Sequence, residues 1–550
     1  MAATPLYSLF FGTFIHLPRQ TSLNGPHTLE INHGVLWVSS EDGKIKGYNW
    51  DVRNEDDLRE FLAGRIWGND RITVIRAREE RNEFFFPGFI DTHIHAPQYP
   101  NCGIFGSSTL LDWLQTYTFP LEKSYGDSKA PDTVPSKAIT SYNQVVSRTL
   151  SHGTTSACYF TTIHVPATNY LASLCHKRGQ RAFIGRVCMD NKDTCPADYR
   201  DTSVDEAVTA TKANIAYIKS LDPNGDLVKP IITPRFAPSC TPQALSELGA
   251  LAAEHKPPLH IQTHISENKD EIAWVKELFP TSANYADVYD KANLLTPRTI
   301  LAHGIHFSPE EREVVAARKS KVSHCPVSNS AIGSGLCPVR VLRDAGITVG
   351  LGTDVSGGYN PGILESVRQA ILVSRLLRHT VRDGDTDENA KNVKEGRENL
   401  SVEEGLYLAT RGGAEVLDMG GELGGFEVGM FWDAQMIQLG SVSLSTFASE
   451  TGSASRSGVF GEKTEKGECV SNVDIFGWEN WTEKVHKWVW NGDDRNVKMV
   501  WVRGGLVHER DEPEKGGEKR GSSFWEFVGG NVFGMVGIGA LAYLGILKMS

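Results

Sequence analysis

The sequence has 550 residues, of which 40% are hydrophobic and 22% charged, so it can form a large core and is neither disordered nor collagen-like. Lys and Arg number 56 against 67 Asp and Glu, and the net charge of −11 leaves no basic surplus for binding a nucleic-acid backbone. The nine cysteines are scattered and never spaced as Cys-x-x-Cys, which argues against a disulfide framework or a zinc ribbon and favours reduced thiols in the cytosol.

The first part of the chain, residues 1–86, is predicted to form β-strands. Short β-rich runs at Ser8–His16, Gly34–Val38 and Ile72–Ala77 are separated by turn residues. This pattern is typical of small β-hairpins rather than helices. We therefore expect a β-subdomain at the N-terminus.

From Phe89 onward, short apolar runs alternate with amphipathic stretches, which is the pattern of a mostly parallel sheet. The eight strand candidates are Phe89–His95, Thr154–Phe160, Ala182–Met189, Val228–Phe236, Leu259–Ser266, Thr299–His303, Lys321–Cys325 and Thr348–Asp354. Eight strands over about 265 residues predict an α/β fold of the (β/α)₈ TIM-barrel type, whose chemistry lies at the carboxyl ends of the strands.

Helix starts between these strands carry their own signals. Thr241-Pro242 offers a capping hydroxyl followed by proline at the first helical position. The segments beginning at Ser308 and Ser401 both read Ser-x-x-Glu, the capping-box pattern. These signals predict a helix at each of the three places.

Beyond the barrel, the charged stretch 383–399 and the Ser/Gly-rich stretch 439–470 are predicted to be solvated insertions without chemistry. The runs 429–439 and 497–507 are β-like again and are expected to pair with the N-terminal strands in a small composite β-sandwich domain. The resulting domain prediction is 1–86 and 414–511 for the two parts of the β-domain, 87–413 for the barrel and 512–550 for a tail.

Within that tail, residues 527–547 carry no charge and include Gly530-x-x-x-Gly534. About twenty apolar residues suffice to cross a bilayer, and small residues at this spacing suit close helix packing. The same density of glycine also makes a weak helix. The sequence thus leaves two interpretations open, a C-terminal membrane anchor and an extension without packed structure.

The first barrel strand ends Asp91-Thr92-His93-Ile94-His95, and the period of two along a strand places both histidines on one face. Later strands end with His264, with His303 and with Asp354 in Gly-Leu-Gly-Thr-Asp. Side chains from four separate strands therefore point to the same rim. Imidazole and carboxylate groups converging in this way are typical of a divalent metal site.

These motifs resemble the metal-dependent amidohydrolase superfamily, and within it the guanine deaminase family. The resemblance lies in a set of sequence motifs within residues 87–413: PGFIDTHIH, HIHAPQYP, LDWLQTYTFP, PRFAPSC, QTHISEN, AHG, SHCPVSNSAIGSG and GLGTDVSGGYN. The resemblance implies zinc-dependent deamination of guanine to xanthine and ammonia, with guanine and water as substrates. It also implies a homodimer.

Carried over by position, the family's zinc ligands fall on His93, His95, His264 and Asp354. Three nitrogens and one carboxylate oxygen leave a position open for water, as catalytic zinc requires. Binuclear relatives use a lysine on the fourth strand, but here that strand has only Lys229, at its start. One zinc ion per subunit is the resulting prediction, although iron or manganese also suits such a ligand set.

The resemblance also implies the roles of the residues that handle protons and charge. Glu267, three residues past His264, would move a proton from the attacking water to a ring nitrogen, although a carboxylate there also suits the start of a helix. Asp354 would orient the water and help to protonate the departing amine, and His303 would stabilise developing charge. Glu267, His303 and Asp354 are the predicted catalytic residues.

The base itself would be held by residues from the same motifs. Gln98 offers both a donor and an acceptor, Arg235 offers only donors suited to the purine carbonyl, and Phe236 can stack on the ring. The predicted substrate contacts are His95, Gln98, Arg235, Phe236, His264, Glu267 and Asp354. Trp113 and Ser328-Asn329 are expected to line the same cavity.

Three alternatives stand beside this prediction. Another aminohydrolase of the superfamily, acting on a different base or a triazine, would share the zinc set and differ at Gln98 and Arg235. A cytidine-deaminase fold needs His-x-Glu and Pro-Cys-x-x-Cys motifs, which this sequence lacks. A non-catalytic scaffold of the same fold is disfavoured because every ligand position is filled.

Overall fold

The computed structural model describes residues 6–19, 27–65, 67, 72–381, 388–442 and 471–510. The predicted anchor at 527–547 and most of the Ser/Gly-rich insertion, residues 443–470, lie outside these ranges. Within them, none of the helices has the length and hydrophobicity needed to cross a membrane. The architecture that follows belongs to the unit Met1–Glu509.

A parallel sheet forms the predicted barrel, in the order β14-β13-β12-β11-β10-β8-β7-β6, with the short β9 beside β10. The strands are β6 (Phe89–His95), β7 (Thr154–Phe160), β8 (Arg181–Gly185), β9 (Val187–Cys188), β10 (Val228–Pro234), β11 (His260–Ile265), β12 (Thr299–His303), β13 (Lys321–His324) and β14 (Val349–Leu351). Backbone hydrogen bonds from Asp354 N to His93 O (2.9 Å) and from His95 N to Val355 O (3.1 Å) bring the end of β14 against β6. All eight predicted barrel strands are thereby confirmed.

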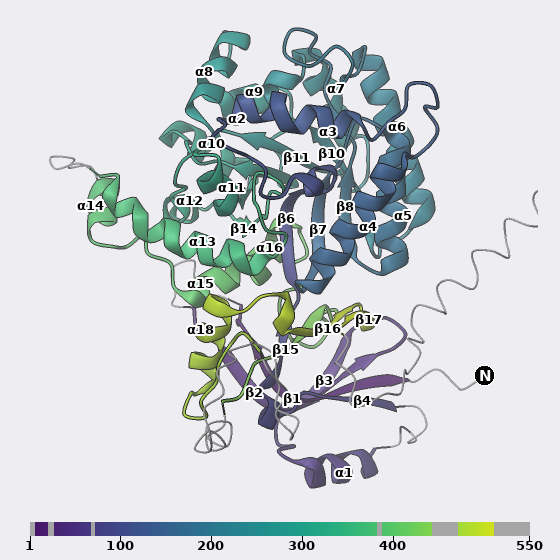
Figure 1. Cartoon of the computed structure of the whole chain (residues 1–550), viewed down its shortest axis with the longest axis vertical. Coiled ribbons are helices and arrows are strands. Elements are labelled where there is room, and N and C mark those ends of the chain that lie inside the picture. The colour runs from purple at the N-terminus through teal and green to yellow at the C-terminus, as the bar shows by residue number, and fades with distance from the viewer. Residues whose placement is uncertain are drawn as a thin grey trace, which may run out of the picture. The chain divides into compact units, whose positions relative to one another are not determined.

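Helices cover the outside of the barrel, and Figure 1 shows α4, α5 and α6 side by side next to β7 and β8. The covering helices are α4 (Ser136–Ser151), α5 (Val165–Arg178), α6 (Val204–Leu221), α7 (Pro242–Ala253), α8 (Lys269–Leu278), α9 (Tyr285–Lys291), α10 (Pro309–Ala317), α11 (Pro326–Ala331), α12 (Val339–Asp344), α13 (Ile363–Leu376), α15 (Val402–Tyr407) and α16 (Gly413–Val416). The predicted caps are present, since Thr241, Ser308 and Ser401 each accept a backbone N–H of the first helical turn.

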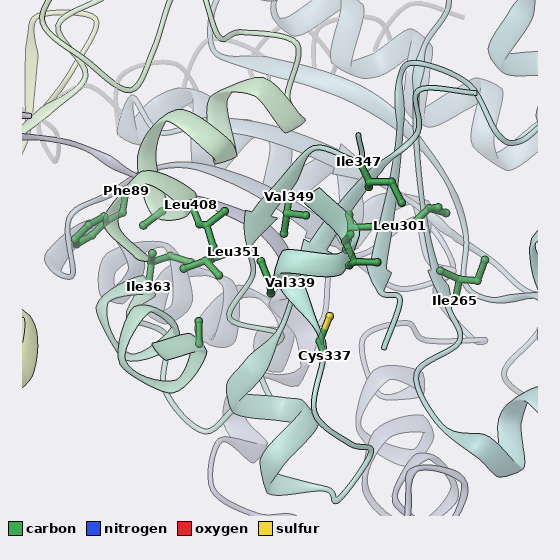
Figure 2. Packing of buried hydrophobic residues seen from close by; sticks show 14 of the residues in the cluster. Phe89, Ile265, Leu301, Cys337, Val339, Ile347, Val349, Leu351, Ile363 and Leu408 are labelled. Carbon is green, nitrogen blue, oxygen red and sulfur yellow. The ribbon is translucent and has the colours of Figure 1, made fainter. Parts of the chain in front are cut away.

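The main hydrophobic core lies between strands and helices. Figure 2 shows Leu301 of β12 and Val349 and Leu351 of β14 in the same cluster as Val339 of α12 and Ile363 of α13. All five side chains are at most 3% exposed. Burying each contributes about 1.5–3 kcal/mol to folding, and the sum holds the strand ends in place.

The strands from the two ends of the chain form one eight-stranded sheet, in the order β17-β16-β15-β5-β1-β2-β3, with β4 also paired to β1. Its strands are β1 (Tyr7–His16), β2 (Glu30–Ser39), β3 (Ile45–Asn49), β4 (Ile72–Arg76), β5 (Glu83–Pro87), β15 (Ala434–Gln438), β16 (Val497–Val502) and β17 (Gly505–Glu509). Antiparallel pairing of β5 with β15 joins the two parts. The predicted composite β-domain is confirmed.

The expectation that residues 1–86 hold hairpins rather than helices is wrong at one place, α1 (Glu55–Ala63). Asn54 accepts hydrogen bonds from the backbone N–H groups of Asp56 and Asp57, and three acidic residues fill the first turn. A capping side chain followed by acidic residues stabilises a helix N-terminus. The capping signal at Asn54 is visible in the sequence, but the β-rich runs on either side led to the prediction of strands.

The Trp-rich stretch 478–490 and the charged stretch 383–399 also contain helices. The Trp-rich stretch contains α18 (Trp481–Asn491), whose Trp488 is fully buried against Phe84, Phe86 and Phe89. The charged stretch contains α14 (Glu388–Lys394). The tryptophans of α18 thus belong partly to the core that links β5 and β6.

Candidate active site and metal centre

Four strands bring histidine and aspartate side chains to one end of the barrel. His93 and His95 lie on β6, His264 lies on β11, His303 ends β12, and Asp354 follows β14. His303 and Asp354 have φ values of 73° and 49°, in the left-handed region that side chains other than glycine and asparagine seldom adopt. Such backbone conformations concentrate at functional sites, where the surrounding fold enforces them.

The side chains of this cluster converge on Asp354. Its Oδ1 lies 3.2 Å from His93 Nε2 and 3.5 Å from His95 Nε2, and its Oδ2 lies 3.8 Å from His303 Nε2. His95 Nε2 and His264 Nε2 are 3.0 Å apart. The structure therefore brings all four predicted metal ligands together.

The tightest group of ligand atoms differs from the prediction in one member. One atom each from His93, His264, His303 and Asp354 lie within 4.8 Å of one another. His303 takes the place predicted for His95, although His95 remains in contact with Asp354 and His264. The cluster thus offers five candidate ligands for a metal ion.

The donor set fits a divalent metal. Nε2 of His93 and Nε2 of His303 are buried and make no hydrogen bond within the described part of the chain. His264 Nδ1 lies 2.6 Å from the carbonyl oxygen of Arg235, so Nδ1–H donates there and the lone pair of Nε2 faces the cluster. A second hydrogen bond of this kind is how proteins orient a metal-binding imidazole.

Electrostatics favour the protonation states that bind a metal. Burial lowers the pKa of His93, His95 and His264, which keeps their imidazoles neutral. Burial alone would raise the pKa of Asp354, but His93 and the neighbouring imidazoles hold it below its usual range. A carboxylate among neutral imidazoles is a typical zinc environment.

Glu267 lies beside this cluster, just beyond β11. Its Oε2 is 3.3 Å from His303 Nε2, and its Oε1 accepts a hydrogen bond of 3.0 Å from the Ser334 hydroxyl. Burial raises the pKa of Glu267 to about 7, which suits a group that takes up and releases a proton near neutral pH. Ser334 was missed by the sequence prediction, because no motif spacing connects it to Glu267.

His303 is held in turn by the segment after β13. Its Nδ1 lies 2.9 Å from Asn329 Oδ1, so the ring donates to the amide oxygen there and directs Nε2 toward Glu267 and Asp354. Burial alone would lower the pKa of His303, but Glu267 and Asp354 raise it. Asn329, predicted only as a lining residue, therefore orients His303.

One cavity joins the cluster to the predicted binding residues. Its lining residues are His95, Gln98, Leu110, Trp113, Leu114, Arg235, Phe236, His264, Glu267, Glu271, His303, Ser328, Ile332 and Asp354. Every predicted substrate contact is in this set, as are the predicted lining residues Trp113 and Ser328. His93 is not among the lining residues.

Gln98 and Arg235 share a partner that the sequence did not indicate. Glu122, in α3 (Phe119–Lys123), accepts hydrogen bonds from Arg235 Nη1 (2.6 Å), Gln98 Nε2 (2.8 Å) and the Tyr199 hydroxyl (2.8 Å). The Glu122 side chain is fully buried. The polar side of the cavity is thus a network around one carboxylate.

Comparison with known proteins places these features in a family. A model described as "Amidohydrolase family" matches residues 84–507. The chain is 48% identical over 425 residues to a protein named "Probable guanine deaminase" from Schizosaccharomyces pombe, a match that covers 77% of this chain and 71% of that protein. It is 38% identical over 504 residues to guanine deaminase from Mus musculus, covering 92% and 97%.

A solved structure is similar over the same extent. The guanine deaminase from C. acetobutylicum, with bound guanine in its active site, superposes with a TM-score of 0.70 at 29% identity. The match covers 91% of this chain and all of that one. The likeness therefore includes the barrel, the composite sheet and the cavity-bearing rim.

Proposed function

This chain belongs to the amidohydrolase family, and on that premise we propose that it converts guanine and water into xanthine and ammonia, a step of purine catabolism. The observation that carries the proposal is the single cavity lined by the His/Asp cluster on one side and by Gln98 and Arg235 on the other. A reaction centre and a base-recognition wall thereby face the same ligand. The names of the similar proteins support guanine over other bases and over triazines.

In the proposed complex the base lies across the cavity with its carbonyl toward Arg235. Arg235 carries only donors, which suit an acceptor oxygen, and Gln98 can both donate to and accept from the base edge. Phe236, 6% exposed, offers a ring face for stacking. The exocyclic amine of guanine then points toward Glu267 and Asp354.

His93, His95, His264 and Asp354 would hold one zinc ion, with His303 beside them. When bound, zinc supplies a Lewis acid that lowers the pKa of water toward neutrality. The fourth barrel strand, β10, carries Lys229, whose Nζ lies over the Phe183 ring at 5.6 Å. Lys229 lies at the start of β10, at the strand end opposite the metal cluster, which supports one metal ion per subunit rather than a lysine-bridged pair.

Proton movement in the proposed mechanism belongs to Glu267. It accepts a proton from the attacking water and delivers it to a ring nitrogen, while the oxygen of water bonds to the carbon that carries the exocyclic amine. Asp354 accepts the remaining proton of that water and passes it to the amine. The C–N bond then breaks, ammonia leaves, and His303 stabilises the charge that develops on the oxygen.

The proposal also covers the cellular location of the protein, its oligomeric state and its contact with a membrane. All eight described cysteines are free, which supports a cytosolic, reducing environment. A homodimer is expected from the family resemblance. The apolar stretch 527–547 is the segment through which the chain would contact a membrane.

The test measures the metal bound to the full-length protein, ammonia release from guanine, adenine and cytosine, and chloride release from a chlorotriazine. We expect about one zinc per chain and turnover of guanine. Glu267→Gln should keep the metal and lower kcat about 10²–10⁴-fold, the usual contribution of a general acid–base group. The matched control is Asp270→Asn, the same chemical change on an exposed side chain of α8, with kcat within twofold.

Two outcomes would contradict the proposal. Turnover of a base other than guanine would keep the mechanism and overturn the assignment of Gln98 and Arg235. A protein that binds zinc and hydrolyses none of the four compounds would support the scaffold interpretation.

A further inference from the structure

The buried carboxylate of Glu122 is not part of the mechanism above, yet it contacts both polar residues assigned to the base. It comes from α3, outside the barrel strands, and reaches Arg235 at the end of β10 and Gln98 in the turn after β6. Its side chain is 0% exposed. A charged group buried so completely needs hydrogen-bond partners. Here they are the Tyr199 hydroxyl and the two binding residues, Gln98 and Arg235.

Gln98 has a fixed amide orientation because of this contact. A carboxylate has no proton to donate, so the atom of Gln98 that lies 2.8 Å from Glu122 Oε1 must be the donor Nε2. The backbone N–H of Ser356 donates to the other end of the amide, Oε1, at 3.3 Å. One N–H and one oxygen lone pair of Gln98 remain for a base, in a defined arrangement.

Arg235 is fixed in the same way. Nη1 donates to Glu122 Oε2 at 2.6 Å and Nη2 to Oε1 at 3.2 Å, a two-point pairing that sets the plane of the guanidinium. The Phe119 ring lies 5.2 Å from the guanidinium carbon. The remaining N–H donors then face an acceptor on a neutral base.

We propose that Glu122 is a positioning residue for specificity: its carboxylate sets the amide of Gln98 and the guanidinium of Arg235 in the donor arrangement that reads the purine carbonyl. This inference rests on the proposed function, which it deepens. In a purine with an amine in place of the carbonyl, the N–H donors of that amine would meet the N–H donors of Arg235 and Gln98, and no hydrogen bond could form between them. Sites of this kind reject the wrong base strongly, because buried polar groups are left unpaired.

The test compares guanine with 2,6-diaminopurine, which keeps the 2-amino group and replaces the carbonyl by an amine. For each variant, kcat and KM are measured with both bases, or the inhibition constant for a base that is not turned over. In Glu122→Gln the new amide can present either its oxygen or its NH₂ to Gln98, so the orientation is no longer unique. The preference for guanine should fall at least tenfold, mainly through KM.

Asp201→Asn is the matched control. Asp201 forms a buried pair with Arg186 and accepts the backbone N–H of Met189, but it makes no hydrogen bond to Gln98 or Arg235 among the described contacts. Both variants break a buried Arg–carboxylate pair and should lower the melting temperature. Only Glu122→Gln should change the preference between the two bases, and Asp201→Asn should leave it within threefold.

Glu122→Asp keeps the charge on a side chain one methylene shorter, and should recover part of the preference. If Glu122→Gln does not fold, an unchanged preference in Glu122→Asp, with its shortened reach, overturns the inference. An equal loss for both bases in Glu122→Gln also overturns it, since that result marks a purely structural role. Failure of the proposed function is a separate result, a wild-type protein that does not turn over guanine, and the comparison of variants then remains measurable through inhibition constants.

Discussion

Each end of the barrel holds a buried histidine close to an aspartate, but the hydrogen-bonding atoms of the two histidines are satisfied differently. At the amino end of β11, His260 Nε2 lies 3.0 Å from Asp418 Oδ2, and its Nδ1 lies 3.2 Å from Arg298 Nη2. At the carboxyl end of the same strand, His264 turns its Nε2 toward His95.

The decisive difference is in the atoms left without partners. Both nitrogens of His260 have a hydrogen-bond partner, and Lys321 adds a second contact to Asp418. At the carboxyl end, Nε2 of His93 and Nε2 of His303 have none among the described residues. Buried polar atoms are normally paired, so unpaired ones aimed at a common point identify a ligand site. Residue types alone do not separate the two ends.

The largest effect expected from this comparison is the loss of metal and activity in His264→Gln. That change removes a ligand from the centre, and the ratio kcat/KM for guanine should fall at least 10³-fold, about 4 kcal/mol, together with the bound zinc. His260→Gln, the same substitution four residues earlier on β11, should keep one zinc and a kcat/KM within threefold. Metal analysis and ammonia release measure both.

The comparison would fail if His260→Gln lost its zinc, or if His264→Gln kept a full equivalent and its turnover. Either result would mean that unpaired nitrogen atoms do not mark the metal site. Both variants must first be shown to be folded, for example by thermal unfolding.

Much of this site could be predicted from the sequence because strand periodicity and strand ends are local signals. His93 and His95 share a face through the period of two, and His264, His303 and Asp354 end apolar runs whose length suits a strand. Once eight strands are recognised, the barrel itself brings these positions together.

Glu122, Ser334 and Asn329 were not assigned their roles for the opposite reason. Each contacts a residue distant in the sequence, so no spacing relates it to its partner. For Glu122 one signal exists, since it lies three residues after Phe119 on the buried face of a short helix. A carboxylate at an apolar position of a helix indicates a buried partner.

The second prediction concerns stability against pH at the amino end of the barrel. Burial lowers the pKa of His260 from 6.5 to about 4, so this ring stays neutral in the folded protein while the unfolded chain binds a proton below about 6.5. The stability contribution of the neutral ring is complete above pH 6.5 and is lost as pH falls. The loss should reach about 2 kcal/mol at pH 5 and about 3 kcal/mol at pH 4, at 1.36 kcal/mol per pH unit.

His260→Gln removes this titration. Urea unfolding of wild type and variant at pH 7.5, 5.0 and 4.0 should show the difference in unfolding free energy shrinking or reversing as pH falls. A difference independent of pH would show that His260 does not titrate in this range.

The smallest expected effect comes from Arg298→Met. Arg298 donates to the Nδ1 of His260, and losing one hydrogen bond of this kind costs about 1 kcal/mol, while most of the arginine's aliphatic volume is kept. Urea unfolding at pH 7.5 should show this loss, and zinc content and kcat should not change. The same variant should also raise the pKa of His260, because a positive charge that disfavours its protonation is gone. Its stability would therefore decline less steeply between pH 6.5 and 4 than that of the wild type, because the folded state would take up a proton on His260 more readily.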